Sequence, residues 1–291
     1  MTGFLNVYKE AGYTSHDVVA IVRKLTRGKV GHTGTLDPDA KGVLPICIGR
    51  ATKLADMVMG QDKSYIAEVV LGVVTDTGDM SGQILHKSLV DFNKDAILET
   101  VAKFHGQQSQ LPPMYSAIKI GGKKLYDLAR KGQTVERKPR DIYIKNIYVT
   151  DIQMDKNSFT IEVDCSKGTY IRSLCMDIGE QLGCGAAMGS LLRTRSGSFA
   201  LNSAYKIEEI KSIAADDQLK NIIMDVEHVL PFPRAYVKDE GYALAKNGNP
   251  LPLSLIDMPE GDIKRVWLYG ANHLIGLFCI NENKLRLEVM M

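Results

Sequence analysis

The segment GHTGTLDP, residues 31–38, carries a single carboxylate, Asp37, in a loop built from two glycines and a proline. Gly31 and Gly34 tolerate backbone angles that other residues resist, and Pro38 fixes its own φ and favours an extended Asp37. Such a loop can hold one acid in a fixed direction, as covalent or acid–base chemistry requires. An ordinary turn is the alternative, because Gly, Asp and Pro are common turn residues.

Helix and strand signals indicate what could position this loop. Thr14 and Asp17 have the spacing of a capping box and predict a helix start just before the loop. Asn93 or Asp95 predicts the start of a second helix, which Gly106 ends.

Downstream, a strand-like run begins at Tyr65, and alternating apolar residues predict half-buried strands around 142–144 and 159–163. An apolar stripe over 171–182 predicts a further helix ended by Gly183. Arg172 lies off that stripe, so we expect it to point into a cleft.

These elements indicate an α+β fold, because strands and helices are mixed without a regular βαβ rhythm. Pro231-Phe232-Pro233 is a plausible linker, and the last ~60 residues hold short strand candidates separated by Gly and Asn turns. We therefore expect a large domain over 1–230 and a small β domain over 231–291.

Composition excludes several classes of protein. The chain is 45% hydrophobic and 24% charged, as globular proteins are, and its net charge of +2 requires any RNA-binding charge to be local. No apolar run approaches the roughly 20 residues that span a bilayer, and the N-terminus lacks signal-peptide features. The five cysteines form no C-x-x-C pair, which argues for reduced thiols in a cytoplasmic protein rather than a zinc site or disulfide framework.

The segment KVGHTGTLDPDAKGVLPICIGRATK, residues 29–53, closely resembles bacterial tRNA pseudouridine synthases of the TruB type. The family pattern G-x-x-G-x-L-D-P-x-A-x-G-x-L is met at Gly31, Gly34, Leu36, Asp37, Pro38, Ala40, Gly42 and Leu44. The resemblance continues at Lys63-Ser64-Tyr65, Thr75-Asp76-Thr77, Pro112-Pro113, Ser116-Ala117, Gly168-Thr169-Tyr170-Ile171-Arg172 and Leu191-Leu192-Arg193. It covers roughly residues 3–200, and more loosely the rest.

The resemblance implies a pseudouridine-synthase-like mixed, largely antiparallel sheet flanked by helices and loops, followed by a small PUA-like RNA-binding domain. It implies isomerisation of uridine 55 in the T-loop of tRNA, with the target base flipped out. The reaction conserves atoms, so no cofactor and no metal are expected. The expected partner is the T-arm of tRNA. The protein is expected to act as a monomer, without a guide RNA and without a membrane.

By resemblance the catalytic residues are Asp37, Tyr65 and Arg172. The carboxylate could attack C1′, add to C6 of the base, or take part in a glycal route, and sequence does not choose among these. Tyr65 would stack under the target base, and Arg172 would pair with Asp37, aim it and lower its pKa. A core tyrosine and a solvated helix arginine are the alternatives.

RNA binding is expected at a basic loop of about residues 112–145, where Ser116–Lys145 holds nine Lys or Arg against three acids. Phosphate contacts there would give sequence-independent, salt-dependent affinity, although a solvated charged face would look similar. His32 is expected to help hold the T-loop and Tyr170 to lie near the base. The full set of expected RNA-binding residues is His32, Tyr170, Lys9, Lys119, Lys123, Lys124, Arg130, Lys131, Arg137, Lys138 and Arg140.

Three other hypotheses stay open. An RNA-binding module without chemistry is suggested by Gly31-His32-Thr33-Gly34, which fits the G-x-x-G loop of KH domains. An aspartate-dependent hydrolase would usually need a second acid or a metal, and Asp39 is near in sequence. A synthase that depends on guide RNA is the third, which modification of a bare T-loop transcript would exclude.

Overall fold

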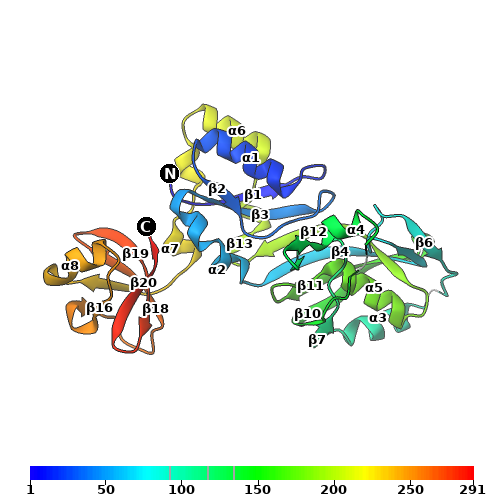
Figure 1. Ribbon diagram of the computed structural model, residues 1–291. Coiled ribbons are helices and arrows are strands. Elements are labelled where there is room, and N and C mark those ends of the chain that lie inside the picture. Colours follow the sequence, from blue (N-terminus) through cyan, green and yellow to red (C-terminus); the bar gives the residue numbers. More distant parts are fainter. Residues whose placement is uncertain (92, 117, 134) are drawn as a thin grey trace.

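The computed structural model describes residues 1–91, 93–116, 118–133 and 135–291. Its strands gather into a long mixed sheet flanked by helices and a smaller C-terminal sheet at one end of the molecule (Figure 1). The predicted α+β class with a C-terminal β-rich domain is confirmed. No helix within the described ranges is long and apolar enough to cross a membrane.

The large sheet has the strand order β14-β1-β3-β12-β4-β11-β10-β7, with β2 added beside β3 and β13 beside β12. Two of its pairs, β1–β14 and β3–β12, are parallel, and the remaining pairs are antiparallel. Its strands are β1 (Gly3–Lys9), β2 (Val30–His32), β3 (Lys41–Ile48), β4 (Lys63–Leu71), β7 (Gly106–Gln110), β10 (Arg140–Gln153), β11 (Ser158–Cys165), β12 (Ala186–Ser196), β13 (Phe199–Ala200) and β14 (Tyr205–Lys206).

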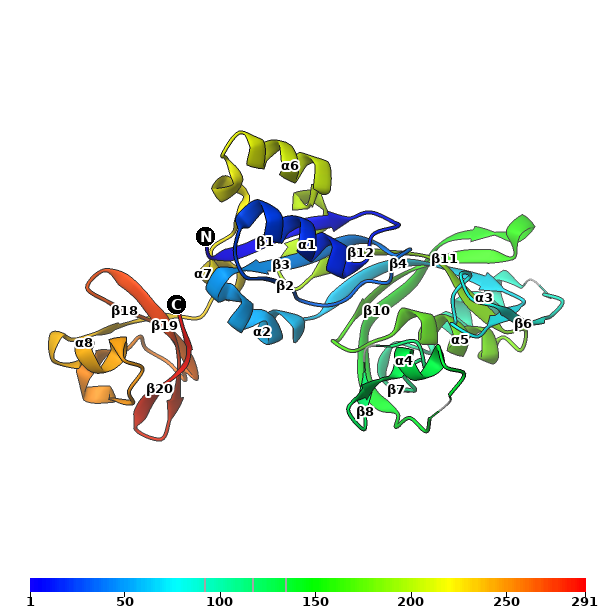
Figure 2. The same ribbon diagram turned by 45° about the horizontal axis from the view of Figure 1, so that its top comes forward.

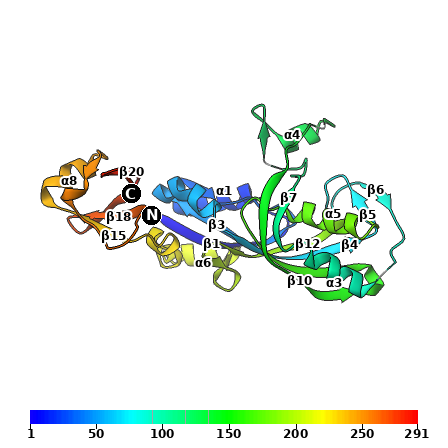
Figure 3. The same cartoon turned by 90° about the horizontal axis from the view of Figure 1, so that it is seen from below.

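The helices lie on the faces and at the ends of these sheets. They are α1 (Ser15–Thr26), α2 (Ala55–Met59), α3 (Lys94–Ala102), α4 (Leu125–Ala129), α5 (Ile171–Gln181), α6 (Ile207–Ala215), α7 (Val226–Val229) and α8 (Asp239–Lys246). Two short hairpins complete this part of the chain, namely β5 (Val73–Thr75) with β6 (Ile84–Lys87), and β8 (Lys119–Ile120) with β9 (Lys123–Lys124). The second hairpin and α4 project from the body of the molecule (Figure 3).

Local sequence signals account for the main helix ends. The predicted capping box is present at α1, where the Thr14 hydroxyl accepts from the backbone N–H of Asp17 and the Asp17 carboxylate accepts from that of Thr14. Asn93 caps α3 by accepting from two backbone N–H groups of the first turn. Gly183 follows α5 with a φ of 75°, a left-handed conformation that glycine adopts without strain.

Side chains along β1 and β3 point alternately to opposite sides. The half of the large sheet that contains these strands therefore has two buried faces. Leu5 and Ile46 face the helices α1 and α6, whereas Phe4 and Cys47 face α2 and α7 on the opposite side (Figures 1 and 2). In the other half, β4, β10, β11 and β12 pack their apolar side against α3 and α5. Strands β3, β12 and β4 therefore join two separately packed halves.

The C-terminal sheet has the order β16-β20-β19-β18-β15-β17. Its strands are β15 (Arg234–Val237), β16 (Leu251–Pro252), β17 (Ile256–Asp257), β18 (Arg265–Gly270), β19 (His273–Asn281) and β20 (Lys284–Met290). Trp267 of β18 is fully buried in the apolar cluster that also contains Phe4 and Val43 of the large sheet. Its indole N–H donates to the carbonyl of Leu230 at 2.8 Å, and Leu277 and Val289 of the C-terminal sheet belong to the same cluster, so the two sheets share one apolar core.

We predict that Trp267→Ala lowers the free energy of unfolding by about 3–5 kcal/mol, because it removes a fully buried aromatic side chain. Urea unfolding followed by circular dichroism measures this loss. Tyr236→Ala is the matched control, since Tyr236 lies in the same sheet with 51% of its surface exposed. Equal effects of the two substitutions would contradict the packing described here.

Candidate active site

Asp37 lies in the loop between β2 and β3, which is fixed at both ends. The backbone N–H of Thr33 donates to the carbonyl of Pro45 at 3.1 Å. The Ser15 hydroxyl accepts from the N–H of Leu36 at 2.9 Å and donates to its carbonyl at 3.1 Å. Leu36 is buried, but the neighbouring Asp37 keeps 41% of its side chain exposed. The carboxylate is therefore held in place and remains open to a ligand.

Lys9, at the end of β1, supports the loop from below. Its side chain is completely buried, and the ammonium donates to the carbonyls of Pro38 at 2.8 Å, Tyr13 at 2.7 Å and Glu10 at 3.1 Å. Burial lowers the pKa of Lys9 to about 8. An ammonium has three N–H donors and all three are occupied here, so the expected contact of Lys9 with RNA does not fit this structure. The residue instead ties the carbonyl after Asp37 to the end of β1.

Arg172, the second residue of α5, binds Asp37 directly. Its Nε lies 3.1 Å from Oδ2 of Asp37, and Nη2 lies 3.5 Å from Oδ1. Nη1 donates to the carbonyl of Thr77 at 3.0 Å, and Nη2 to that of Tyr115 at 2.7 Å. Only 7% of this side chain is exposed, so the guanidinium is a buried fork with fixed direction, which a lysine could not reproduce.

A second carboxylate shares the same guanidinium. Oδ2 of Asp79 lies 3.7 Å from Nε of Arg172, and Asp79 also accepts from the hydroxyls of Thr77 and Ser81. The pKa of Asp37 lies above its ordinary value, because burial disfavours the charged form and Asp79 adds a like charge nearby. Arg172 lowers the pKa of Asp37, as expected, but burial has the larger effect and keeps the pKa above its ordinary value.

Tyr65 and Tyr170 lie near enough to Asp37 for its charge to act on their phenols. Tyr65 lies on β4, and burial raises the pKa of its phenol, on which the charge of Asp37 also acts. Tyr170 directly precedes α5, and the side-chain amide of Gln110 binds both its N–H and its carbonyl, at 2.8 and 3.0 Å. Burial raises the pKa of Tyr170 as well, and Asp37 and Arg172 are among the charges that act on it. Chain segments far apart in sequence therefore bring an acid, a cation and two phenols together.

His32 keeps a defined protonation state at the start of the loop. Its Nδ1 accepts from the backbone N–H of Gly34 at 3.3 Å, so the proton of the neutral ring is on Nε2. Burial and the nearby His16 lower the pKa of His32 to about 4, and the two rings pack edge to face at 5.5 Å. His32 can act as a neutral hydrogen-bond donor near physiological pH.

The basic loop provides a different kind of surface. Arg130, Lys131, Lys138 and Arg140 are exposed on or beside the projecting segment, and the Arg130 guanidinium lies over the ring of Tyr126. Arg137 is half-buried and donates to the carbonyl of Pro112 at 2.9 Å, which links the two ends of the loop. The side chains of Lys119, Lys123 and Lys124 lie outside what the structure describes.

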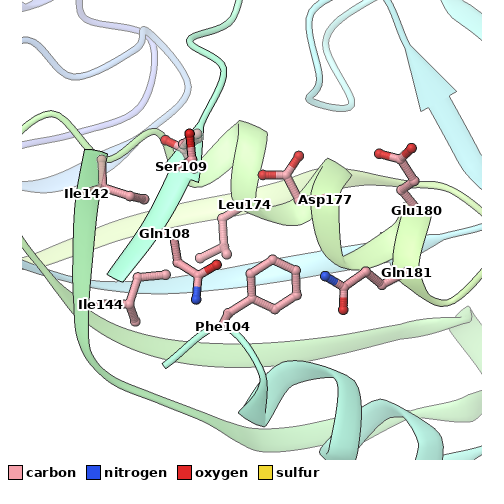
Figure 4. A pocket seen from close by; sticks show the side chains of 10 residues that line it. Phe104, Gln108, Ser109, Ile142, Ile144, Leu174, Asp177, Glu180 and Gln181 are labelled. Carbon is pink, nitrogen blue, oxygen red and sulfur yellow. The ribbon is translucent and has the colours of Figure 1, made fainter. Parts of the chain in front are cut away.

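A cavity of about 450 Å³ lies on another side of α5. Phe104 and Leu174 form part of its apolar wall, and Asp177 and Glu180 lie at its rim (Figure 4). Burial, followed by the charge of Glu180, raises the pKa of Asp177 to about 6. Its lining includes none of the residues around Asp37, so this cavity is separate from the candidate active site.

Sequence reasoning missed two residues of this region. Asp79 follows the quoted Thr75-Asp76-Thr77 motif by two positions, and only the folded loop reveals that it reaches Arg172. Arg193 ends the quoted Leu191-Leu192-Arg193 motif, but no role was assigned to it. No group of three His, Cys, Asp or Glu that could hold a metal occurs in the described part of the chain.

Comparison with known proteins places this site in a family. The family model of TruB family pseudouridylate synthases (N-terminal domain) matches residues 22–171, and that of the tRNA pseudouridylate synthase B C-terminal domain matches residues 172–231. The tRNA pseudouridine synthase B of Alkaliphilus oremlandii is 49% identical over 95% of this chain and 92% of its own length. That of Clostridioides difficile is 48% identical over 99% of this chain and 98% of its own.

A solved structure shares the fold of nearly the whole chain. The structure described as a Cbf5-Nop10-Gar1 complex contains a chain that is 27% identical and superposes with a TM-score of 0.72, covering 99% of this chain and 84% of its own. Both family models lie within this sequence, and the curated relatives match it over nearly their full lengths. The chain belongs to the TruB family of tRNA pseudouridine synthases.

Proposed function

We propose that this chain isomerises uridine 55 in the T-loop of tRNA to pseudouridine, with Asp37 as the essential carboxylate. The observation that supports this most strongly is the pairing of Asp37 with the buried guanidinium of Arg172, beside Tyr65. A structural ion pair would not need an exposed carboxylate, yet 41% of the Asp37 side chain remains accessible. Family membership supplies the reaction class.

The reaction requires that the N1–C1′ bond break, that the uracil turn, and that a C5–C1′ bond form. The hydrogen on C5 leaves as a proton, and N1 gains one, so atoms and electrons balance without a redox step. Arg172 fixes the direction of the Asp37 carboxylate through two contacts and holds the loops around it through the carbonyls of Thr77 and Tyr115. Tyr65 would support the flipped base by stacking, which is worth about 1–3 kcal/mol per base.

The target nucleotide must leave the T-loop stack, which costs a few kcal/mol. Contacts of the basic loop with phosphates would offset this cost, because each neutralised phosphate releases counterions. Arg130, Lys131, Lys138 and Arg140 are exposed and suited to that role. His32, with a proton on Nε2, would donate to the displaced T-loop. The C-terminal β domain would add a further RNA contact.

We propose in addition that the chain acts without a guide RNA. Its curated relatives are named tRNA pseudouridine synthase B and match it over nearly their full lengths. Modification of an unmodified T-arm transcript by the purified chain would support this proposal. A strict requirement for a second RNA would contradict it.

The site of modification is tested by carbodiimide labelling and primer extension on a tRNA transcript. We predict a stop at position 55 with the native protein and none with Asp37→Asn, because the amide keeps the shape but cannot act as a carboxylate. Asp39→Asn is the matched control, since Asp39 is exposed in the same loop, and it should retain the stop. Stops elsewhere, or with Asp37→Asn, would contradict the proposal. Binding of tRNA with no stop from any variant would favour the RNA-binding module.

The pH dependence of the single-turnover rate tests the electrostatics of the site. Because the folded pKa of Asp37 is raised, the reactive carboxylate should be lost on acidification at a pH above the ordinary aspartate value of about 3.9. Asp79→Asn removes a like charge and should move this acidic limb to lower pH. Asp76→Asn, on the same loop but outside the Arg172 contacts, should leave it in place. A shift in the opposite direction would refute the role given to Asp79.

Salt titration of tRNA binding tests the basic loop. Lys131→Ala and Lys138→Ala should each weaken binding and reduce the slope of log K against log salt by about 1, if each side chain contacts one phosphate. Lys156→Ala should leave the slope unchanged, since Lys156 is equally exposed but lies in the turn between β10 and β11. Filter binding over a range of salt concentrations measures all three variants. Unchanged slopes for both loop variants would show a solvated charged face instead.

A further inference from the structure

Arg193 lies at the join between the two halves of the large sheet. It belongs to β12, where its backbone is opposite Gly42 of β3 on one side and Tyr65 of β4 on the other. A Cβ added to Gly42 would lie 2.2 Å from the carbonyl oxygen of Arg193, so only glycine allows this close approach. The arginine is 2% exposed and among the largest fully enclosed side chains of the protein.

The guanidinium of Arg193 joins three chain segments. Nε donates to the carbonyl of Val43 on β3 at 2.7 Å, and Nη2 donates to the carbonyl of Gly34 in the Asp37 loop at 3.1 Å. Tyr65 lies opposite Arg193 across β4 and β12, and the charge of Arg193 acts on its phenol. One planar group therefore ties the loop that carries the carboxylate to β3, next to the strand pair that holds Tyr65.

The burial of the Arg193 guanidinium is energetically unfavourable, which is unexpected for a residue that only maintains the fold. In the described part of the chain no carboxylate lies within ion-pair distance of Arg193, whereas Arg195, two residues along the strand, pairs with Asp164 at 3.1 Å. Burying a cation without a counter-ion costs more than burying an apolar side chain of similar size. Two carbonyls compensate part of this cost. A role in fixing the positions of its neighbours explains why a charged guanidinium occupies this buried place.

We propose that Arg193 is a positioning residue of this active site, which fixes the Gly34 carbonyl of the Asp37 loop relative to β3 and to Tyr65 on β4. The proposal rests on the proposed function. Because Tyr65 is paired with Arg193 across the two strands, the loop and the tyrosine keep one relative position when a base stacks on the ring.

The charges around Tyr65 make its titration sensitive to the position of Arg193. Arg193 lowers the pKa of Tyr65, whereas burial, Cys165 and Asp37 raise it, and burial has the largest effect. Replacing the planar fork by a lysine ammonium should change the distance between the cation and the phenol of Tyr65. The titration of Tyr65 should then change, although the strand remains paired through its backbone.

The test uses the full chain with 3-fluorotyrosine at position 65, followed by ¹⁹F NMR as a function of pH. Arg193→Lys should shift both the resonance and its titration midpoint. Arg195→Lys, the matched control on the same strand, should change neither. Because this measurement needs no turnover, it separates failure of the Arg193 proposal from failure of the proposed pseudouridylation.

The same variants are compared in single-turnover assays with tRNA. Arg193→Lys should lower the rate at least tenfold, since small misplacements of reacting groups are costly. The Kd for tRNA should stay within about threefold of the native value, because Arg193 is buried and meets no RNA. An unchanged ¹⁹F titration, or a rate within twofold of native, would overturn the proposal. So would parallel losses of rate and binding that track a lowered Tm.

Arg193→Gln covers a failure of Arg193→Lys to fold. It is neutral, keeps two N–H donors for the carbonyls of Val43 and Gly34, and should also shift the ¹⁹F titration of Tyr65, because the cation that acts on the phenol is lost. An unchanged titration in this variant would contradict the proposal.

Discussion

The buried guanidinium of Arg172 is the constraint on which the rest of the site depends. It makes two contacts with Asp37, a third with Asp79, and two with the carbonyls of Thr77 and Tyr115. Because a buried cation must be fully hydrogen-bonded to be tolerated, these partners are held as firmly as the arginine itself. The first turn of α5 therefore provides one fixed point for three segments. They are the Asp37 loop, the loop after β5 and the start of the basic loop.

Further buried cations extend the same principle around the Asp37 loop. Lys9 binds the carbonyl of Pro38 from the end of β1, and Arg193 binds the carbonyl of Gly34 from the centre of β12. Both rely on backbone carbonyls of the loop, so they restrain it without competing for the Asp37 carboxylate. The result is an acid whose surroundings are rigid while 41% of its own side chain faces outward. This combination suits a residue that must meet a bulky, flipped nucleotide.

Much of this organisation follows from local sequence. The capped start of α1 and the apolar stripe of α5 depend on neighbouring residues, and both formed as predicted. The roles of Lys9 and Asp79 could not be predicted, because each is set by contacts between segments distant in the chain. The net shift in the pKa of Asp37 could not be predicted for a similar reason. The attraction of Arg172 follows from pairing, whereas the larger opposing effect of burial exists only in the folded protein.

The most direct test of the central claim is tritium release from tRNA whose uridines are labelled at C5. The hydrogen leaves C5 only if the base is re-attached through that carbon, so release reports the complete reaction. The account predicts release with the native protein, and none with Asp37→Ala although this variant still binds tRNA. Release by Asp37→Ala at the native rate, or no release from a native protein that binds tRNA, would contradict it.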